Sequence, residues 1–182
     1  MKLQLRDYPR IAIFVGLIAA LGLLPAVNIL PGVPVTAQTL GVMLAGAVLG
    51  SYRGTIAVFV FEVLVLAGLP LLAGGRGGVA VFAGPTAGYL IGWLLGAWVI
   101  GYVIHALPKL PLAISSSLAF VLGGIVAVYV PGILWFAYVN QAPVLAVALG
   151  NAPFLVGDSV KVAVAVIVLL AVKAAYPKAL TK

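Results

Sequence analysis

The chain consists mostly of apolar segments about as long as a lipid bilayer is thick. Of its 182 residues, 65% are hydrophobic and 7% are charged, whereas about a quarter of the residues in an ordinary soluble domain are charged. Backbone polar groups in lipid must find their partners within the protein, so such segments fold as helices. The sequence therefore predicts an all-α integral membrane protein that forms a single domain over residues 1–182.

Six segments are predicted to cross the membrane. Their approximate ranges are 10–27, 35–50, 54–72, 86–106, 112–131 and 154–175. Similar segments follow the first along the whole chain, so we do not expect the first to be a cleaved signal peptide. The second is short, about 24 Å as a helix, and it begins with Thr36, Gln38 and Thr39. These polar side chains predict that its end lines a cavity rather than lipid.

The distribution of positive charge predicts the topology. With the N-terminus in the cytoplasm, eight Lys and Arg residues lie inside, Arg76 alone lies outside, and Lys161 lies within the membrane. This bias follows the positive-inside rule. The eight inside residues are Lys2, Arg6, Arg10, Arg53, Lys109, Lys173, Lys178 and Lys182. We therefore expect cytoplasmic termini in a prokaryotic plasma membrane, with the net charge of +7 meeting anionic membrane lipids and not nucleic acid.

The composition argues against an enzyme. The chain has no Cys, one His and three acidic residues, which is too few for most metal sites or carboxylate pairs. No phosphate-binding G-x-x-x-x-G-K-[ST] motif is present. His105 is predicted at the cytoplasmic end of the fourth segment, away from the other polar residues of the membrane. We expect no catalytic residues, no metal and no cofactor.

Asp158 and Lys161 are charged residues inside the sixth predicted segment. A charge at the centre of a membrane helix costs roughly 3 kcal/mol even on the lenient insertion scale. Positions i and i+3 lie on one helix face, so the two side chains project to the same side. One interpretation is a self-neutralising pair that only helps the helices to assemble. The other is a polar pocket for a small charged ligand.

A glycine-rich linker joins the third and fourth segments on the predicted outer side. Gly74, Gly75, Gly77 and Gly78 surround Arg76. Glycine backbone can approach a ligand closely and offers free N–H donors. The linker is therefore either a binding loop or a merely flexible connection.

Three blocks of sequence resemble a known family. They run from Pro31-Gly-Val-Pro-Val-Thr36-Ala-Gln38 to Gly54, from Gly68-Leu-Pro70 through the glycine linker to Gly84-Pro-Thr-Ala-Gly-Tyr89-Leu-Ile-Gly92, and over Pro153-Phe-Leu-Val-Gly-Asp158-Ser-Val-Lys161. In this order and spacing they resemble the biotin-specific substrate-binding subunit (S component, BioY family) of energy-coupling-factor (ECF) transporters.

The resemblance implies a six-helix bundle that binds biotin near the outer surface. It assigns Asp158, Lys161, Gly74, Gly75 and Tyr89 to the ligand, and the polar residues Thr36, Gln38 and Arg76 are added as neighbours. Some relatives carry Asn in the loop where this chain has Gly74, so one amide contact is missing or moved. Biotin has ureido N–H groups that a carboxylate can accept, and a carboxylate that either Lys161 or Arg76 can neutralise.

The resemblance also implies partners. Ala12, Gly16 and Ala20 form a small-residue stripe on the first segment, which permits close helix approach. In the family this helix docks on the transmembrane coupling subunit, and two ATPase subunits supply the energy. The alternative is that the stripe packs within the bundle.

A different functional class is a stand-alone secondary transporter or facilitator for a small carboxylate-bearing vitamin, with Glu62, Asp158 and Lys161 as an ion relay. Inverted repeats would favour it, and none is evident. Glu62 lies where the family is usually apolar, so we expect either an ion pair or a protonated carboxyl there.

Overall fold

A computed structural model describes residues 3–30 and 33–177. The helices are α1 (Asp7–Gly22), α2 (Gln38–Leu66), α3 (Val79–Ala83), α4 (Ala87–Ala106), α5 (Leu112–Ala119), the π-helix η1 (Phe120–Val126), α6 (Ala127–Val139), α7 (Val144–Gly150) and α8 (Ala152–Ala175). The prediction of helices alone is incomplete, because β1 (Val27–Leu30) and β2 (Val33–Val35) form an antiparallel ribbon. Lys2, Lys178 and Lys182 lie outside the described residues.

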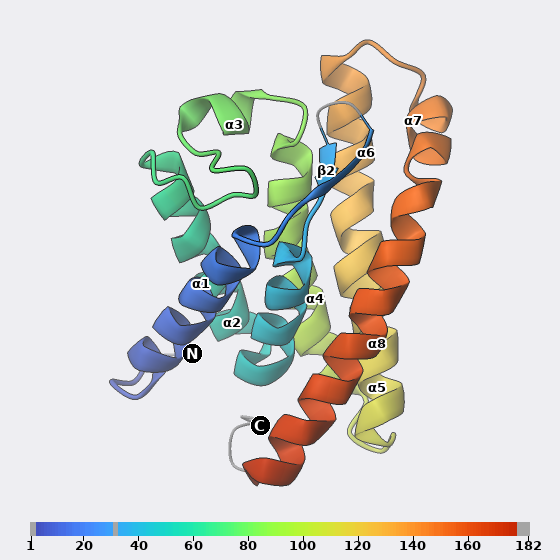
Figure 1. Ribbon diagram of the computed structural model, residues 1–182. Coiled ribbons are helices and arrows are strands. Elements are labelled where there is room, and N and C mark those ends of the chain that lie inside the picture. Colours follow the sequence, from blue (N-terminus) through green and yellow to red (C-terminus); the bar gives the residue numbers. More distant parts are fainter. Residues whose placement is uncertain (1–2, 31–32, 178–182) are drawn as a thin grey trace.

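The helices stand side by side as a bundle, with the ribbon and α3 at one end (Figure 1). We call this end the ribbon end; α7 also lies there, while the N- and C-terminal regions lie at the opposite end. α4 is central, since it packs against α2, α5, η1 and α6. The first and third predicted segments end earlier than expected, at Gly22 and Leu66. The fifth continues as one apolar stretch, Leu112–Val139, and α7 occupies the linker before α8.

α2 consists of two helical arms folded back on each other. Gly50 interrupts it with φ 80° and ψ 174°. A Cβ atom added to Gly54 would lie 2.8 Å from both the Ala45 carbonyl oxygen and the Gly46 Cα. In a continuous helix, positions eight or nine apart are separated by about 12 Å or more, so the chain must reverse at Gly50. The reversal is visible in Figure 1 and falls between the predicted second and third segments.

Glycines let the backbones of neighbouring helices come together. A Cβ on Gly92 would lie 2.7 Å from the backbone of Val128 in α6, and a Cβ on Gly101 would lie 2.0 Å from the Ser51 nitrogen at the start of the second arm of α2. Such contacts hold membrane helices together, because lipid offers no hydrophobic drive for helix association. α4 is thereby fixed between the α2 elbow and α6.

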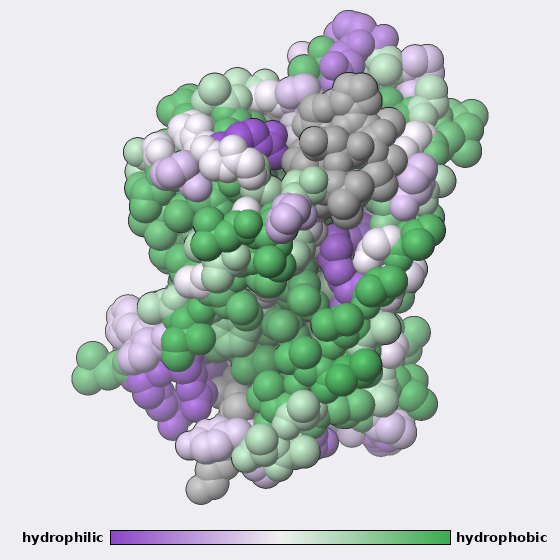
Figure 2. Space-filling view, in the orientation of Figure 1, coloured by the Kyte–Doolittle hydropathy of each residue, from purple (hydrophilic) through white to green (hydrophobic). Residues whose placement is uncertain are grey.

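The outer surface of the bundle is apolar. Figure 2 shows hydrophobic residues over most of its middle, hydrophilic residues mainly towards the two ends, and one hydrophilic patch near mid-height. On α8, the side chains of Val156, Val160 and Ile167 are exposed. Within the described residues, four helical stretches are long and apolar enough to cross a membrane: Gln38–Leu66, Ala87–Ala106, Leu112–Val139 and Ala152–Ala175. The chain thus has the surface of an integral membrane protein.

α1 is fastened near its start to the second arm of α2. The Asp7 carboxylate is buried and pairs with Arg53, with 3.0 Å between Oδ2 and Nε. The same oxygen accepts the Gln4 backbone N–H at 2.9 Å. Arg53 lies three residues beyond the Gly50 elbow, so this pair fixes α1 to the elbow region.

We predict that Gly101→Ala destabilises the protein by about 1–3 kcal/mol, because the added methyl group overpacks the contact with Ser51. Thermal unfolding in detergent measures the effect. Gly16→Ala is the matched control, since no described atom beyond the local backbone of α1 lies within 4 Å of a Cβ there. Equal melting temperatures for the two variants would contradict the close approach of α4 to the elbow.

Candidate functional site

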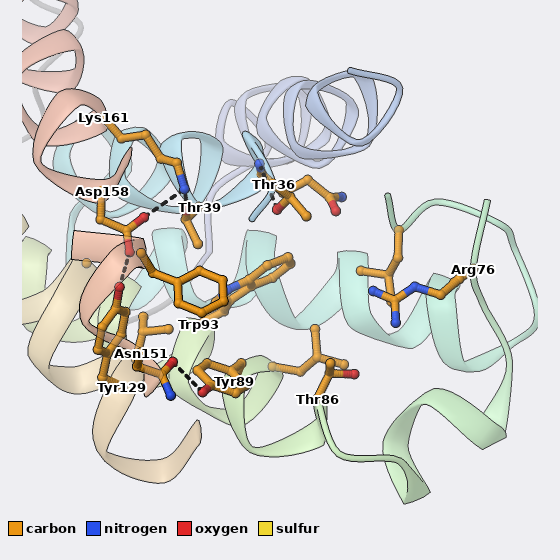
Figure 3. A pocket seen from close by; sticks show the side chains of 16 residues that line it. Thr36, Thr39, Arg76, Thr86, Tyr89, Trp93, Tyr129, Asn151, Asp158 and Lys161 are labelled. Atoms are coloured by element: carbon orange, nitrogen blue, oxygen red, sulfur yellow. Dashed lines mark hydrogen bonds and ion pairs between the residues drawn. The ribbon is translucent and has the colours of Figure 1, made fainter. Parts of the chain in front are cut away.

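A pocket lies between the first arm of α2, α4, α6, α8 and the linker after α2. Its cavity volume is about 80 Å³. Its lining residues are Thr36, Gln38, Thr39, Leu72, Arg76, Thr86, Tyr89, Leu90, Trp93, Gly124, Val128, Tyr129, Asn151, Phe154, Asp158 and Lys161. Figure 3 shows their side chains converging on one space. Six of the eight residues predicted to contact the ligand are among them.

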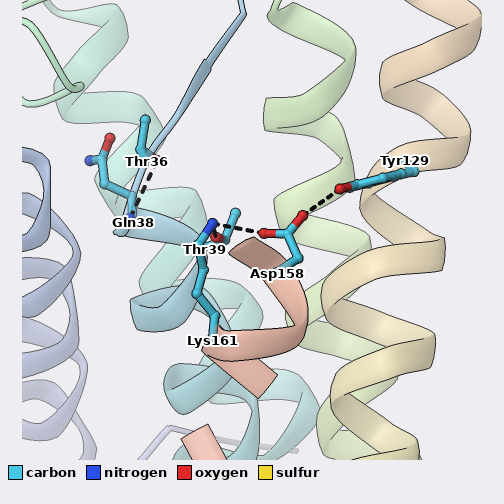
Figure 4. Close-up of polar contacts among 6 residues, drawn as sticks. All are labelled: Thr36, Gln38, Thr39, Tyr129, Asp158 and Lys161. Carbon is cyan, nitrogen blue, oxygen red and sulfur yellow. Dashed lines mark hydrogen bonds and ion pairs between the residues drawn. The ribbon is translucent and has the colours of Figure 1, made fainter. Parts of the chain in front are cut away.

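α8 presents one continuous face to the pocket. Asn151, Phe154, Asp158 and Lys161 are spaced by three, four and three residues, which places them along one side of a helix. Lys161 Nζ lies 2.7 Å from Asp158 Oδ1 and 2.9 Å from the Thr39 hydroxyl. The Tyr129 hydroxyl donates to the other carboxylate oxygen of Asp158. Figure 4 shows this chain of contacts joining α2, α8 and α6.

Asp158 and Lys161 form the ion pair that the self-neutralising interpretation predicts. The pair nevertheless lies in the wall of the pocket. The Asp158 residue is 5% exposed. Each of its carboxylate oxygens has one protein donor and retains a further lone pair. The Lys161 ammonium uses two of its three N–H donors on protein oxygens. This charged pole can therefore accept and donate further hydrogen bonds without losing its internal neutrality.

The opposite end of the pocket carries a second polar pole, made by Arg76 and Thr86. In Figure 3 these residues lie across the cavity from Asp158 and Lys161. Arg76 Nε donates to the Ala73 carbonyl at 3.3 Å. No carboxylate in the described part of the chain forms an ion pair with it. The guanidinium is thus free to meet a negative charge of a ligand.

Aromatic and aliphatic side chains separate the two poles. Tyr89 and Trp93 come from successive turns of α4, and Phe154 comes from α8. The Tyr89 hydroxyl donates to Asn151 Oδ1 at 2.8 Å, and Asn151 Nδ2 donates to the Val147 carbonyl at 2.8 Å. The Tyr89 ring is thereby held in place. The pocket combines a mostly apolar middle with polar groups at its ends.

The turn at residues 72–76 is ordered by hydrogen bonds, in contrast to the alternative of a merely flexible linker. The backbone N–H of Leu72 donates to the Arg76 carbonyl, and those of Gly75 and Arg76 donate to the Leu72 carbonyl. Gly74 and Gly75 have φ values of 76° and 69°, which only glycine adopts at little cost. Both line a neighbouring hollow with Arg76, and neither lines the pocket.

Gln38 lies at the pocket but uses its amide within the protein. Its two N–H donors reach the carbonyls of Ile18 and Leu71 at 3.1 and 3.0 Å, and its Oε1 accepts the Ala73 N–H at 3.1 Å. Both donors of the side chain are therefore occupied. Thr36 also lines the pocket, and its hydroxyl accepts the Gln38 backbone N–H at 3.3 Å.

The small-residue stripe of α1 faces away from the bundle. Ala12, Gly16 and Ala20 are all exposed. Apart from the neighbouring residues and backbone of α1 itself, no described atom lies within 4 Å of a Cβ built on Gly16. The alternative that this stripe packs within the bundle is therefore wrong.

Glu62 and His105 lie outside the pocket. Glu62 is 7% exposed and its Oε1 has no hydrogen-bond partner among the described residues. His105 Nδ1 lies 2.9 Å from the Gly101 carbonyl of the preceding helical turn. Glu62 and the pair of Asp158 and Lys161 therefore do not share one site, as an ion relay through the three would require.

Sequence reasoning missed several residues of the pocket. Asn151 could have been found by its spacing, seven residues before Asp158 on the same face of α8. Tyr129 and Trp93 carried no such signal, because each sits in an uninterrupted apolar segment. Thr39 was noticed as a polar residue at a helix start and proves to contact Lys161.

These features describe a membrane-embedded helical protein with an amphipathic pocket, and comparison with known proteins identifies its family. The sequence profile of the BioY family matches residues 1–178. Biotin transporter BioY of Rhodobacter capsulatus is 46% identical over 184 residues, covering 96% of this chain and 97% of that protein. Biotin transporter BioY of Rhizobium etli is also 46% identical, covering 94% and 95%. The chain belongs to the BioY family.

A solved structure shows the same fold. The crystal structure of the S component for biotin from an ECF-type ABC transporter superposes with a TM-score of 0.88 at 32% identity. The match covers 93% of this chain and 91% of that one. The predicted resemblance is confirmed, and the family is one of transport proteins and not of enzymes.

We predict that Lys161→Met destabilises the ligand-free protein by about 3 kcal/mol, because it leaves the Asp158 carboxylate buried without its cation. The double variant Asp158→Asn, Lys161→Met should regain part of this loss. Thermal unfolding in detergent compares the two. A double variant less stable than Lys161→Met alone would show that Asp158 does not depend on Lys161 for its charge balance.

Proposed function

We propose that this protein is the biotin-binding membrane subunit of an ECF-type vitamin uptake transporter. The observation that carries the proposal is the pocket with two polar poles and an apolar middle, in a chain of the BioY family. Biotin has the same order of groups: a ureido ring, an apolar bicycle and chain, and a terminal carboxylate. The protein itself binds the vitamin without a cofactor and without chemistry on it.

The ureido ring fits the pole made by Asp158, Lys161 and Thr39. Asp158 has free lone pairs for the ureido N–H groups, and the remaining Lys161 donor can reach the ureido carbonyl. A hydrogen bond to a charged group contributes more than a neutral one. Tyr129 holds the Asp158 carboxylate on its far side, so this acceptor is oriented before the ligand arrives.

The carboxylate of biotin fits the opposite pole. Lys161 is already paired with Asp158 at 2.7 Å, whereas Arg76 has no carboxylate partner in the described chain. A guanidinium can bind a carboxylate through two N–H groups, and the Thr86 hydroxyl lies nearby in the pocket lining. These contacts support Arg76, rather than Lys161, as the cation that meets the negative charge of the ligand. Tyr89, Trp93 and Phe154 cover the apolar bicycle and chain.

The membrane topology has six crossings with both termini in the cytoplasm. The helical elements that cross the membrane are α1, the two arms of α2, α4, the stretch Leu112–Val139 and α8. The charge bias of the sequence then places the ribbon end, with Arg76, outside the cell. The pocket opens towards this side, in the plasma membrane of a prokaryote.

The exposed stripe of Ala12, Gly16 and Ala20 is the docking surface for the transmembrane coupling subunit. Small residues allow two helix backbones to approach closely, and α1 leaves these three uncovered. The coupling subunit and two ATPase subunits supply the energy for uptake. The alternative of a stand-alone transporter with an ion relay loses support, because Glu62 lies outside the pocket.

We predict that Arg76→Gln weakens one ligand selectively and Asp158→Asn weakens two ligands alike, measured by titration calorimetry with biotin and an uncharged biotin amide. Arg76→Gln should weaken the binding of biotin about tenfold, because one charge-assisted hydrogen bond is lost, and should leave the binding of the amide nearly unchanged. Asp158→Asn should weaken both ligands by about 2 kcal/mol, because both carry the ureido group. Each variant is the control of the other. If Arg76→Gln weakened both ligands equally, the carboxylate pole would be wrong.

We predict that Gly16→Leu separates ligand binding from transport. The larger side chain pushes the docking backbones apart, and dispersion contacts weaken steeply with distance. Biotin should still bind the isolated subunit, while copurification with the coupling subunit and ATP-driven uptake fall. Ala171→Leu, at an exposed position of α8, is the matched control. Unchanged uptake in Gly16→Leu would place the docking surface elsewhere.

The topology is tested with single cysteines, since the chain has none of its own. Val79→Cys lies at the ribbon end and Lys109→Cys lies between α4 and α5, and both positions are exposed. In intact cells a membrane-impermeant maleimide should label the first and not the second. Labelling of Lys109→Cys without permeabilisation would reject the proposed orientation.

A further inference from the structure

Gln38 joins three parts of the chain through one side chain. Its exposure is 0%, and its amide bonds to the carbonyl of Ile18 in α1, the carbonyl of Leu71 and the N–H of Ala73. The last two flank Leu72, which lines the pocket and begins the turn that carries Arg76. A single buried amide thus connects α1 to the base of this turn.

Among the described residues, few other hydrogen bonds join the turn to the bundle, although Leu72 packs in the hydrophobic core. Its own hydrogen bonds run between Leu72 and Arg76, and the next bond to a helix joins the Gly78 N–H to the Val65 carbonyl at 2.7 Å. Gly74 and Gly75 meet no atom within 4 Å of an added Cβ, so their side of the turn is open. The position of Arg76 over the pocket therefore depends on the burial of Leu72 and on the Gln38 hydrogen bonds at the base of the turn.

α1 is shaped to receive this connection. A Cβ added to Gly22 would lie 2.5 Å from the Leu71 carbonyl oxygen and 2.8 Å from Gln38 Nε2. Only glycine leaves room there for the end of α1 to touch both groups. The helix that carries the exposed stripe is therefore in direct contact with the linker that carries Arg76.

We propose that Gln38 is a positioning residue that couples the docking helix α1 to the turn over the ligand pocket. A movement of α1 on docking shifts the Ile18 carbonyl, and Gln38 transmits the shift to Leu71 and Ala73. The turn then changes its hold on the ligand. The role in ligand retention rests on the function proposed above, whereas the tie between α1 and the turn stands independently of which ligand binds.

The tie is tested with a buried reporter thiol. Ala73 is 3% exposed, and the chain has no cysteine, so Ala73→Cys reports opening of the turn through its rate of maleimide labelling. Gln38→Met keeps the size of the side chain and removes all three hydrogen bonds. It should raise the labelling rate of the ligand-free protein about tenfold, since buried partners are left unpaired. Gln141→Met, at an exposed amide, should leave the rate unchanged.

Gly22→Ala perturbs the same contact from the α1 side and should raise the rate in the same way. It keeps the test decisive if Gln38→Met fails to fold, which size-exclusion chromatography reports. Unchanged labelling of the reporter in a folded Gln38→Met or Gly22→Ala protein overturns the proposal. This measurement uses no ligand, so failure of biotin to bind the wild-type chain would reject the proposed function and leave this result standing.

The coupling is tested in the assembled transporter. Assembly with the coupling subunit should change the labelling rate of the Ala73→Cys reporter at least about threefold, which corresponds to less than the contribution of one hydrogen bond. Gln38→Met should abolish this change. Gln38→Met should also weaken the binding of biotin more than the binding of biotin amide, because Arg76 is displaced. A purely structural residue would weaken both ligands equally. A labelling rate that does not respond to assembly in the wild type, or equal losses of the two ligands, overturns the coupling role.

Discussion

The charged pair of Asp158 and Lys161 is the feature around which the rest of the bundle is arranged. Two charges in the apolar interior are tolerated only when they are paired and hydrogen-bonded. The pair reaches α2 through Thr39 and α6 through Tyr129. Satisfying it therefore requires three helices to meet at one depth, and the space between them becomes the pocket. The same groups that make the charges tolerable leave lone pairs and a donor for a ligand.

Close glycine contacts and side-chain hydrogen bonds both hold the helices of the bundle together. Gly54, Gly92 and Gly101 bring backbones together along the bundle, where lipid provides no hydrophobic drive. At the ribbon end Gly22 makes a close contact with Leu71, and Gln38 adds hydrogen bonds between α1 and the linker after α2. α1 is held by Arg53 near its start and by Gln38 near its end. Its middle is left with the stripe around Gly16 exposed.

The sequence predicted those features that depend on local composition. Apolar segments gave the helices, and the spacing of Asp158 and Lys161 predicted their shared face. The break between the second and third segments was predicted and falls at Gly50. The Tyr129 contact and the role of the Gln38 amide depend on segments far apart in the chain, so a local sequence pattern does not predict them. The ribbon is a local hairpin of two short strands, which a search for long apolar segments does not detect. Gly74 and Gly75 were assigned to the ligand by resemblance, and that assignment stays a prediction, since they line the neighbouring hollow.

Titration of the purified full chain with biotin in detergent, followed by calorimetry, tests the central claim most directly. The pocket is built entirely from this chain, so binding requires no coupling subunit and no nucleotide. The account predicts saturable binding with one biotin per chain, and a large loss of affinity for a biotin analogue whose ureido N–H groups are methylated. Absence of binding by the folded chain, or equal affinity for the methylated analogue, would contradict it.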